Sequence, residues 1–312
     1  MIVCVPATPL DSYKRLQAKF WADPKSSATR ALLTECVIHS IKFLSGAPRV
    51  KLGTPERKRR KGSQDAEPTL VEEVPIVGKS YFAFSRSNKL SRAINNDLFH
   101  PDVKEWKAFL AWLDAGDFTP NNEFSSERLT SLIYGVAISF CACVDLLKSG
   151  DQQTPGTFFA YLISHLFASR VGVNPDTSLP LINAEADSRL PTDFIFTVTR
   201  KRRFHLGLKT STRERAIQVF AHQAMLDNIH GKGVYMGTPV ILAETKASKP
   251  KREVVEICLP KQWMIYQRYL AHLTRVYYLD VPKAYAALNE ADVEVAVKPF
   301  GDFFFEADLL KP

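Results

Sequence analysis

The chain has 312 residues, of which 46% are hydrophobic and 24% are charged, a balance that excludes a disordered chain and is typical of a globular protein. This length allows one large domain, or a core of about 180 residues with an appended region. The net charge of +8 favours a polyanionic partner such as nucleic acid.

Neither a disulfide framework nor a membrane span is indicated. The five cysteines are an odd number without zinc spacing, and Cys141 and Cys143 lie in an apolar run, so we expect reduced, buried thiols in a cytoplasmic protein. The first residues lack the basic start and long apolar stretch of a signal peptide. Residues 129–147 approach the length of a membrane span, but two serines and Asp145 interrupt them. We therefore expect a buried helix and no membrane partner.

The first half of the chain predicts mainly helices. Apolar residues at helical spacing predict helices at 28–45 and 103–115. Between them, residues 48–68 are rich in charge, glycine and proline, which indicates an exposed basic loop. Its cluster RKRRK at 57–61 could lie along phosphates or could simply be solvated. We predict a mostly helical N-terminal region over 1–150.

In the second half, strands and helices alternate. Residues 157–170 have helical spacing, 192–199 alternate between apolar and polar, and 204–209 return as a second strand after a short basic turn. Further elements follow: a helix at 213–229 with Thr212 as its N-cap, strands near 238–244 and 253–259, a helix at 260–273, a strand at 275–279, a short helix at 282–288 and a strand at 293–298. This pattern predicts an α/β fold over 151–312, a mixed β-sheet flanked by helices.

The predicted hairpin brings together two residues that suit metal-assisted phosphodiester hydrolysis. Asp193 lies near the start of one strand and Lys209 at the end of its partner, so an antiparallel pairing sets them opposite each other. Asp193 could hold a divalent cation, and Lys209 could orient or deprotonate the attacking water. An ordinary cross-strand salt bridge is the alternative.

The segment after Lys209 suits the reading of base pairs. Arg213, Glu214 and Arg215 fall on the first turn of the predicted helix, where they could enter the major groove. Arginine can bind guanine O6 and N7, and glutamate can accept from cytosine N4, so the triplet suits G·C pairs. A charged, solvated first turn with pairing between neighbours is the alternative.

These residues together resemble a known family. The motif Leu-Pro-Thr-Asp193, followed sixteen positions later by Lys209-Thr-Ser-Thr-Arg-Glu-Arg, is similar to the PD-(D/E)XK type II restriction endonucleases, in particular to the group that recognises sites bounded by CC and GG. The resemblance covers about 155–225. It implies a restriction-endonuclease-like core, Mg²⁺ as the cofactor with Asp193 as its ligand, and double-stranded DNA as the partner. A palindromic site implies a homodimer.

The resemblance also implies DNA-binding roles. Arg213 and Arg215 would contact guanines, and Glu214 would contact a cytosine. Gln218 matches a glutamine that follows the triplet in the group.

Two positions depart from the group. The acidic residue expected two positions before the lysine is Gly207, and the glutamate that the group has thirteen residues after the lysine is His222. Imidazole is a poor ligand for magnesium and a better one for manganese or zinc. His222 is our third catalytic candidate, with Glu185 and Asp187 as alternative sources of the second acidic ligand. A histidine without a metal role remains an alternative.

The sequence thus predicts a type II restriction endonuclease that uses magnesium to hydrolyse both DNA strands at a short palindromic site with G·C pairs. One alternative is a structure-directed repair or recombination nuclease with the same core. Another is a DNA-binding protein whose nuclease centre has decayed, for which Gly207, Ala160 and His222 are the evidence. In the group the helix before the first strand often starts with a Gly-x-x-Glu-like motif, whereas this sequence has Gly156-Thr-Phe-Phe-Ala160.

Overall fold

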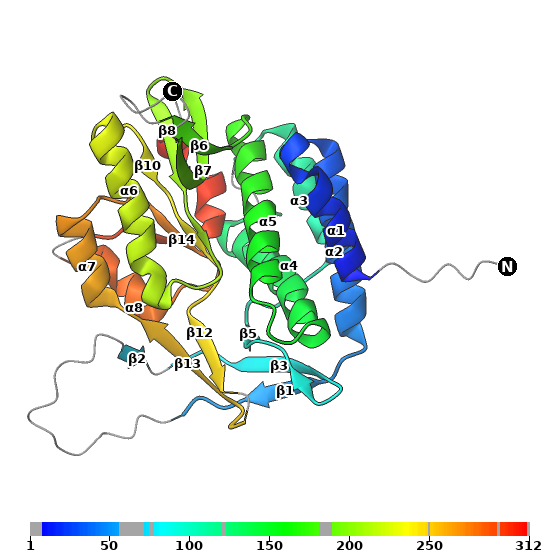
Figure 1. Ribbon diagram of the computed structural model, residues 1–312. Coiled ribbons are helices and arrows are strands. Elements are labelled where there is room, and N and C mark those ends of the chain that lie inside the picture. The colour runs from blue at the N-terminus through cyan, green and yellow to red at the C-terminus, as the bar shows by residue number, and fades with distance from the viewer. Residues whose placement is uncertain are drawn as a thin grey trace, which may run out of the picture.

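Helices of the N-terminal half lie beside a mixed sheet that the C-terminal half forms (Figure 1). The computed structural model describes residues 8–55, 72–74, 76, 78–119, 123–180, 189–248, 250–291 and 294–310.

The N-terminal helices begin at capping residues. They are α1 (Pro9–Lys19), α2 (Ser27–Ser45), α3 (Val103–Ala115) and α4 (Ser126–Leu147), and α5 (Gln153–Val171) follows them. The side chains of Ser26, Asp102 and Ser125 accept backbone N–H groups at the starts of α2, α3 and α4, and these bonds satisfy donors that have no partner within the helix. A short 3-10 helix, η1 (Phe20–Ala22), follows α1. The helices predicted at 28–45, 103–115 and 157–170 are confirmed.

Helix α4 is the central helix of this half. It is long and apolar enough to cross a membrane, but 89% of its most apolar window is buried inside the protein. It packs against α2 and α5. The prediction of a buried helix is therefore confirmed. The cysteines of the described part, which are Cys36, Cys141, Cys143 and Cys258, are buried, as expected.

A small antiparallel sheet accompanies these helices. It contains β1 (Arg49–Leu52), β3 (Tyr81–Arg86), β4 (Lys89–Leu90) and β5 (Ile94–Asn95). The loop prediction for 48–68 is wrong over β1, because Arg49–Leu52 pairs with the first residues of β3 in register. The basic cluster at 57–61 lies outside the described residues.

The main sheet belongs to the second half. This name covers two four-stranded sheets, of order β10-β8-β7-β6 and β15-β14-β11-β9, which backbone hydrogen bonds from Thr238 N to the His205 carbonyl and from Val240 N to the Gly207 carbonyl connect. The strands are β6 (Asp176–Pro180), β7 (Arg189–Thr199), β8 (Arg202–Leu206), β9 (Leu208–Lys209), β10 (Met236–Gly237), β11 (Val240–Ile241), β14 (Val276–Tyr278) and β15 (Val297–Pro299). Strands β6, β7 and β8 are antiparallel, whereas β10 is parallel to β8. In the other four-stranded sheet, strands β9, β11, β14 and β15 are all parallel to one another. Antiparallel strands on one side and parallel strands on the other make this a mixed sheet.

Other elements complete the second half. They are η2 (Arg213–Arg215), α6 (Ala216–His230), β12 (Thr245–Ser248), β13 (Glu253–Cys258), α7 (Pro260–Tyr269), α8 (Lys283–Ala286), η3 (Ala287–Glu290), η4 (Phe300–Phe304) and α9 (Ala307–Leu310). Strands β12 and β13 form an antiparallel pair, and β2 (Glu72–Val74) of the N-terminal half pairs with β13 as a third strand.

Helices cover both faces of the main sheet. Along β11 and the residue after it, Val240 and Leu242 belong to the large core with α4 and α5, whereas Ile241 belongs to a second core with α6 and α7. This alternation is expected because successive side chains of a strand point to opposite faces. Figure 1 shows α4 and α5 on one side of the sheet and α6 and α7 on the other. The prediction of an α/β fold with a mixed, helix-flanked sheet is confirmed, and the division of the chain at residue 150 stays a prediction.

Candidate active site and nucleic-acid interface

Lys209 lies where parallel strands end at one edge of the main sheet. Strand β9 ends at Lys209, which pairs with Ile241 at the end of β11, and Ile241 also pairs with Tyr278 at the end of β14. In open α/β sheets, ligands bind outside the carboxyl ends of the strands. A ligand-binding site is therefore expected at this edge of the sheet.

The strand register brings Asp193 near this edge. Phe194 of β7 pairs with Leu206 of β8. Continuing the antiparallel register by one residue sets Asp193 opposite Gly207, and Lys209 lies two residues further along on the same face. The side chain of Asp193 is outside the described part of the chain. Its pairing with Lys209 therefore stays a prediction that the backbone register supports.

His222 lies on α6, next to Gln223, whose side chain connects this helix to the sheet. The His222 ring is 6.1 Å from the ring of the buried His205 of β8. His205 Nδ1 lies 3.1 Å from Gln223 Oε1, and the Gln223 amide donates to the Tyr235 carbonyl at 2.8 Å. Gln218 is exposed on the same helix.

A metal centre is not complete among the described side chains. Within that part of the chain, no group of three or more His, Cys, Asp or Glu side chains could hold a metal ion. Glu185 and Asp187 lie outside the described residues. The role of His222 and the source of the second acidic ligand stay predictions.

The Arg-Glu-Arg triplet forms a 3-10 turn rather than the first turn of an α-helix. Helix α6 begins only at Ala216, and Arg213 has a positive φ of 32°. Arg213 Nη2 donates to the Thr245 carbonyl at 2.7 Å, and the exposed Arg215 donates from Nη2 to the Ser211 carbonyl at 3.1 Å. Both arginines are thus held by main-chain carbonyls. The side chain of Glu214 is outside the described part.

A buried carboxylate, which the sequence reasoning missed, holds this turn. Glu244 is 1% exposed and accepts from Ser211 Oγ at 2.8 Å, from Thr212 N at 3.0 Å and from Arg213 N at 3.2 Å. The hydroxyls of Thr212 and Tyr278 donate to it as well. Burial raises the pKa of Glu244, while the hydrogen bonds from the turn oppose this shift.

The same contacts correct the prediction for Thr212. We expected its side chain to cap the helix, but the structure gives it no capping bond, because its hydroxyl donates to Glu244 instead. The sequence signal for Glu244 was a glutamate directly after the apolar run Val-Ile-Leu-Ala. A carboxylate at such a place needs several donors to remain buried.

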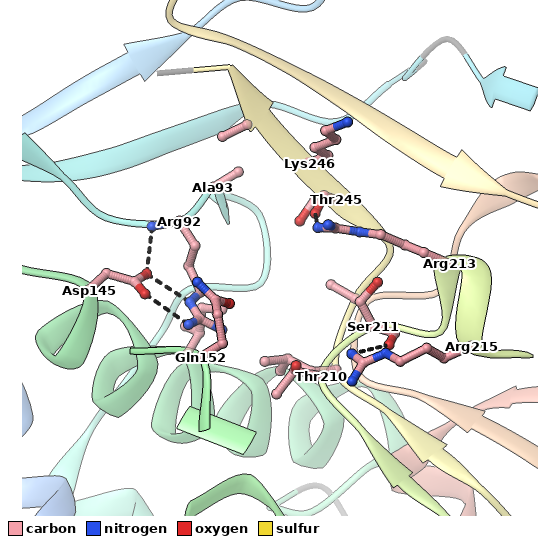
Figure 2. Close-up of a pocket in the computed structure, with 14 residues that line it drawn as sticks. Arg92, Ala93, Asp145, Gln152, Thr210, Ser211, Arg213, Arg215, Thr245 and Lys246 are labelled. Atoms are coloured by element: carbon pink, nitrogen blue, oxygen red, sulfur yellow. Dashed lines mark hydrogen bonds and ion pairs between the residues drawn. The ribbon is translucent and has the colours of Figure 1, made fainter. Parts of the chain in front are cut away.

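A cleft opens beside the turn. It has a volume of about 440 Å³ and lies between the N-terminal half and the edge of the main sheet. Figure 2 shows Arg92 and Asp145 on one side, with Arg213, Arg215 and Lys246 on the other. Asp145 is the acidic side chain of this lining, and it is paired with Arg92. The cleft is therefore basic and suits an anion.

A buried ion cluster closes the neighbouring part of the edge. Lys79 of the N-terminal half donates to Asp280 Oδ1, just after β14, at 2.8 Å and to Glu256 Oε1 at 2.9 Å. Tyr81 also donates to Asp280, at 3.1 Å. Because both carboxylates are almost fully buried, this cluster joins the two halves of the chain and is not an open site.

The fold has a counterpart among solved structures. The crystal structure of the type IIP restriction endonuclease Kpn2I is similar, with a TM-score of 0.75, 23% sequence identity and 96% of each chain covered. Comparison with protein-family models and with curated protein sequences finds no match. The expected restriction-endonuclease-like fold is confirmed. The chain has, over nearly its whole length, the fold of a type IIP restriction endonuclease.

Proposed function

We propose that the protein is a type II restriction endonuclease, which hydrolyses both strands of double-stranded DNA at a short palindromic site with G·C pairs. The observation that carries this proposal is the Arg213–Arg215 turn, which follows Lys209 closely in the sequence at the carboxyl edge of the sheet. Hydrogen bonds to the Glu244 carboxylate hold this turn in place. Catalysis and base reading would then share one short segment. The likeness of the fold to a type IIP restriction endonuclease supports the same conclusion.

Magnesium is the proposed cofactor, and Asp193 is its proposed ligand. A carboxylate is the oxygen donor that Mg²⁺ prefers. When bound, Mg²⁺ stabilises charge on the phosphate and lowers the pKa of a bound water. Glu244 does not fit as a second ligand, because its oxygens already accept hydrogen bonds from the turn. That ligand would come from His222 or from the segment that contains Glu185 and Asp187.

Lys209 would act on the water and on the phosphate. As an ammonium it would orient the attacking water and offset the charge that develops on the phosphoryl oxygens, and as an amine it would take up the water proton. Its place at the end of β9, diagonal to Asp193 in the extended register, supports these roles.

Arg213, Glu214 and Arg215 would read the base pairs, with Gln218 beside them. Each good bidentate contact discriminates against a wrong base by about 1–3 kcal/mol. Arg213 donates to the Thr245 carbonyl through Nη2, and this bond helps to hold the guanidinium at the edge of the basic cleft. Two copies of the turn, one from each protomer of a homodimer, would read the two halves of a palindrome.

A digest of a plasmid of known sequence tests the proposal. Purified protein is incubated with magnesium, and the ends of the fragments are mapped by sequencing; Asp193→Ala protein prepared in the same way is the control for contaminating nucleases. A fixed palindromic cut site with 5′-phosphates, absent from the control digest, is expected.

Two other results would support the alternatives. Cleavage without a fixed site would favour a structure-directed repair or recombination nuclease. A protein that binds DNA but cleaves with neither magnesium nor manganese would favour a decayed nuclease centre, for which Gly207 and His222 are the sequence evidence.

A further inference from the structure

We propose that the basic cleft holds a phosphate of the DNA backbone between Arg92 on one side and Lys246, on the side of the Arg213–Arg215 turn, on the other. This inference rests on the proposed function, because it takes the turn to face the bases. It gives the N-terminal half a direct part in DNA binding, since Arg92 comes from the loop between β4 and β5.

The charges of the lining point to a phosphate. The cationic side chains that line the cleft are Arg92, Arg213, Arg215 and Lys246, while Asp145 is the carboxylate among the lining residues. Thr210 and Thr245 add hydroxyl groups. Bases are often held by stacking on aromatic side chains, and none of the described residues that line this cleft is aromatic. The lining therefore suits a phosphate better than a base.

Arg92 is held in position by Asp145. The carboxylate accepts from Arg92 N at 2.8 Å, from Nε at 2.8 Å and from Nη2 at 2.9 Å. This pairing uses one edge of the guanidinium, and the side chain has further N–H donors. A guanidinium already fixed by a carboxylate loses little conformational freedom when it binds a phosphate.

Lys246 lies on the opposite side of the cleft, on β12 (Figure 2). Its side chain is exposed, and it makes no ion pair with a carboxylate of the described part of the chain. An unpaired ammonium on a flexible stem serves as a point charge for a phosphate. The cleft thus has one fixed cation and one adaptable cation across from each other.

The salt dependence of DNA binding tests this proposal. Binding is measured in EDTA, so that no cleavage occurs, on the duplex with the cut site and on an unrelated duplex. The logarithm of the association constant falls linearly with the logarithm of salt concentration, and each lost phosphate contact reduces the slope by about 0.9. We expect this reduction for Lys246→Gln on both duplexes. Lys14→Gln, on the outer helix α1, removes the same charge and is expected to keep the wild-type slope.

A double variant isolates Arg92. Arg92→Gln with Asp145→Asn removes the cation without leaving the partly buried Asp145 carboxylate unpaired, and the net charge stays the same. A slope reduced by about 0.9 would therefore report a lost contact and not a weaker overall field. Thermal unfolding checks that the variant is folded, and if it is not, Lys246→Gln decides alone.

Contradicting results are separate for the two proposals. The cleft proposal is overturned if Lys246→Gln changes the slope no more than Lys14→Gln does, or if a folded double variant keeps the wild-type slope. A loss confined to the duplex with the cut site would also overturn it, since that would indicate base reading. Reduced slopes in a protein that binds but never cleaves would support the cleft and overturn the nuclease. A wild-type protein that binds no DNA would overturn both.

Discussion

Removal of the Glu244 carboxylate should free the Arg213–Arg215 turn, which we propose reads base pairs. Glu244→Ala takes away the acceptor of the backbone N–H groups of Thr212 and Arg213. A buried donor without an acceptor costs about 1–3 kcal/mol, so these two groups together cost about 2–6 kcal/mol of folding stability. A freed turn must also be ordered again on DNA, at about 1–2 kcal/mol per residue. For Arg213–Arg215 this is at least about 3 kcal/mol, so specific affinity should fall about a hundredfold.

The conservative variant should restore much of this loss. In Glu244→Gln the amide NH₂ can replace Oε1, where the hydroxyls of Thr212 and Tyr278 can turn to accept from it. The remaining oxygen, in the place of Oε2, still accepts from Thr212 N and Arg213 N. We therefore expect Glu244→Gln to bind the cognate duplex within about tenfold of the wild type, because the backbone bonds survive as neutral ones.

The assay is a titration of cognate and unrelated duplexes at one salt concentration, with urea unfolding of each variant. Glu256→Ala is the matched control, because it removes another buried carboxylate that bonds to Lys79 and not to the turn. It should lower stability but keep the ratio of the two affinities. The reasoning is refuted if folded Glu244→Ala keeps this ratio within about threefold of the wild type, or if Glu256→Ala loses it equally.

The other predictions concern chemistry, base reading and pH. Asp193→Ala and Lys209→Ala should each abolish cleavage in a magnesium digest, with site-specific binding kept within about tenfold, because both serve the reaction and not base reading; near-normal cleavage by either would contradict the site. His222→Ala should lose at least about tenfold in cleavage rate, whereas His222→Glu should keep magnesium activity because it supplies a carboxylate; a normal rate in His222→Ala would exclude a metal role. Glu214→Ala should weaken cognate binding by about ten- to a hundredfold if the carboxylate accepts from cytosine, and tighter binding would show that it only repels phosphate. Burial lowers the pKa of His165 to about 4, whereas in the unfolded chain its pKa is near 6.5, so between these two pH values only the unfolded chain takes up this proton. The free energy of unfolding, measured with urea, should therefore fall by about 3 kcal/mol as the pH is lowered from 6.5 to 4. His165→Gln should reduce this fall.

Features that depend on local sequence could be predicted. The helices at 28–45 and 103–115 followed from apolar spacing, and the strand register of the 192–209 hairpin follows from alternation and a short turn. Features that depend on distant partners could not. Strand β1 looked like a charged loop because its partner β3 begins far along the chain.

The prediction that α6 starts at Arg213–Arg215 was wrong for the same reason. Its local sequence is that of a helix start, with Thr212 as a good N-cap. The carboxylate that redirects Thr212 lies 32 residues further on. The catalytic residues themselves were selected by motif and spacing, and their roles remain predictions for the experiments above.

The buried cluster of Lys79, Glu256 and Asp280 would restrict how the proposed DNA substrate enters. It joins the N-terminal half to the sheet beside the cleft, so the two walls cannot swing apart like a hinge without exposing or separating these charges. Breaking a buried ion pair costs about 3–5 kcal/mol. The cleft is therefore rigid, and if the protein binds DNA as we propose, the double helix would have to adapt its shape to the cleft. Sequences that bend or unstack easily would fit it better, so bases that no side chain touches would also influence the choice of site.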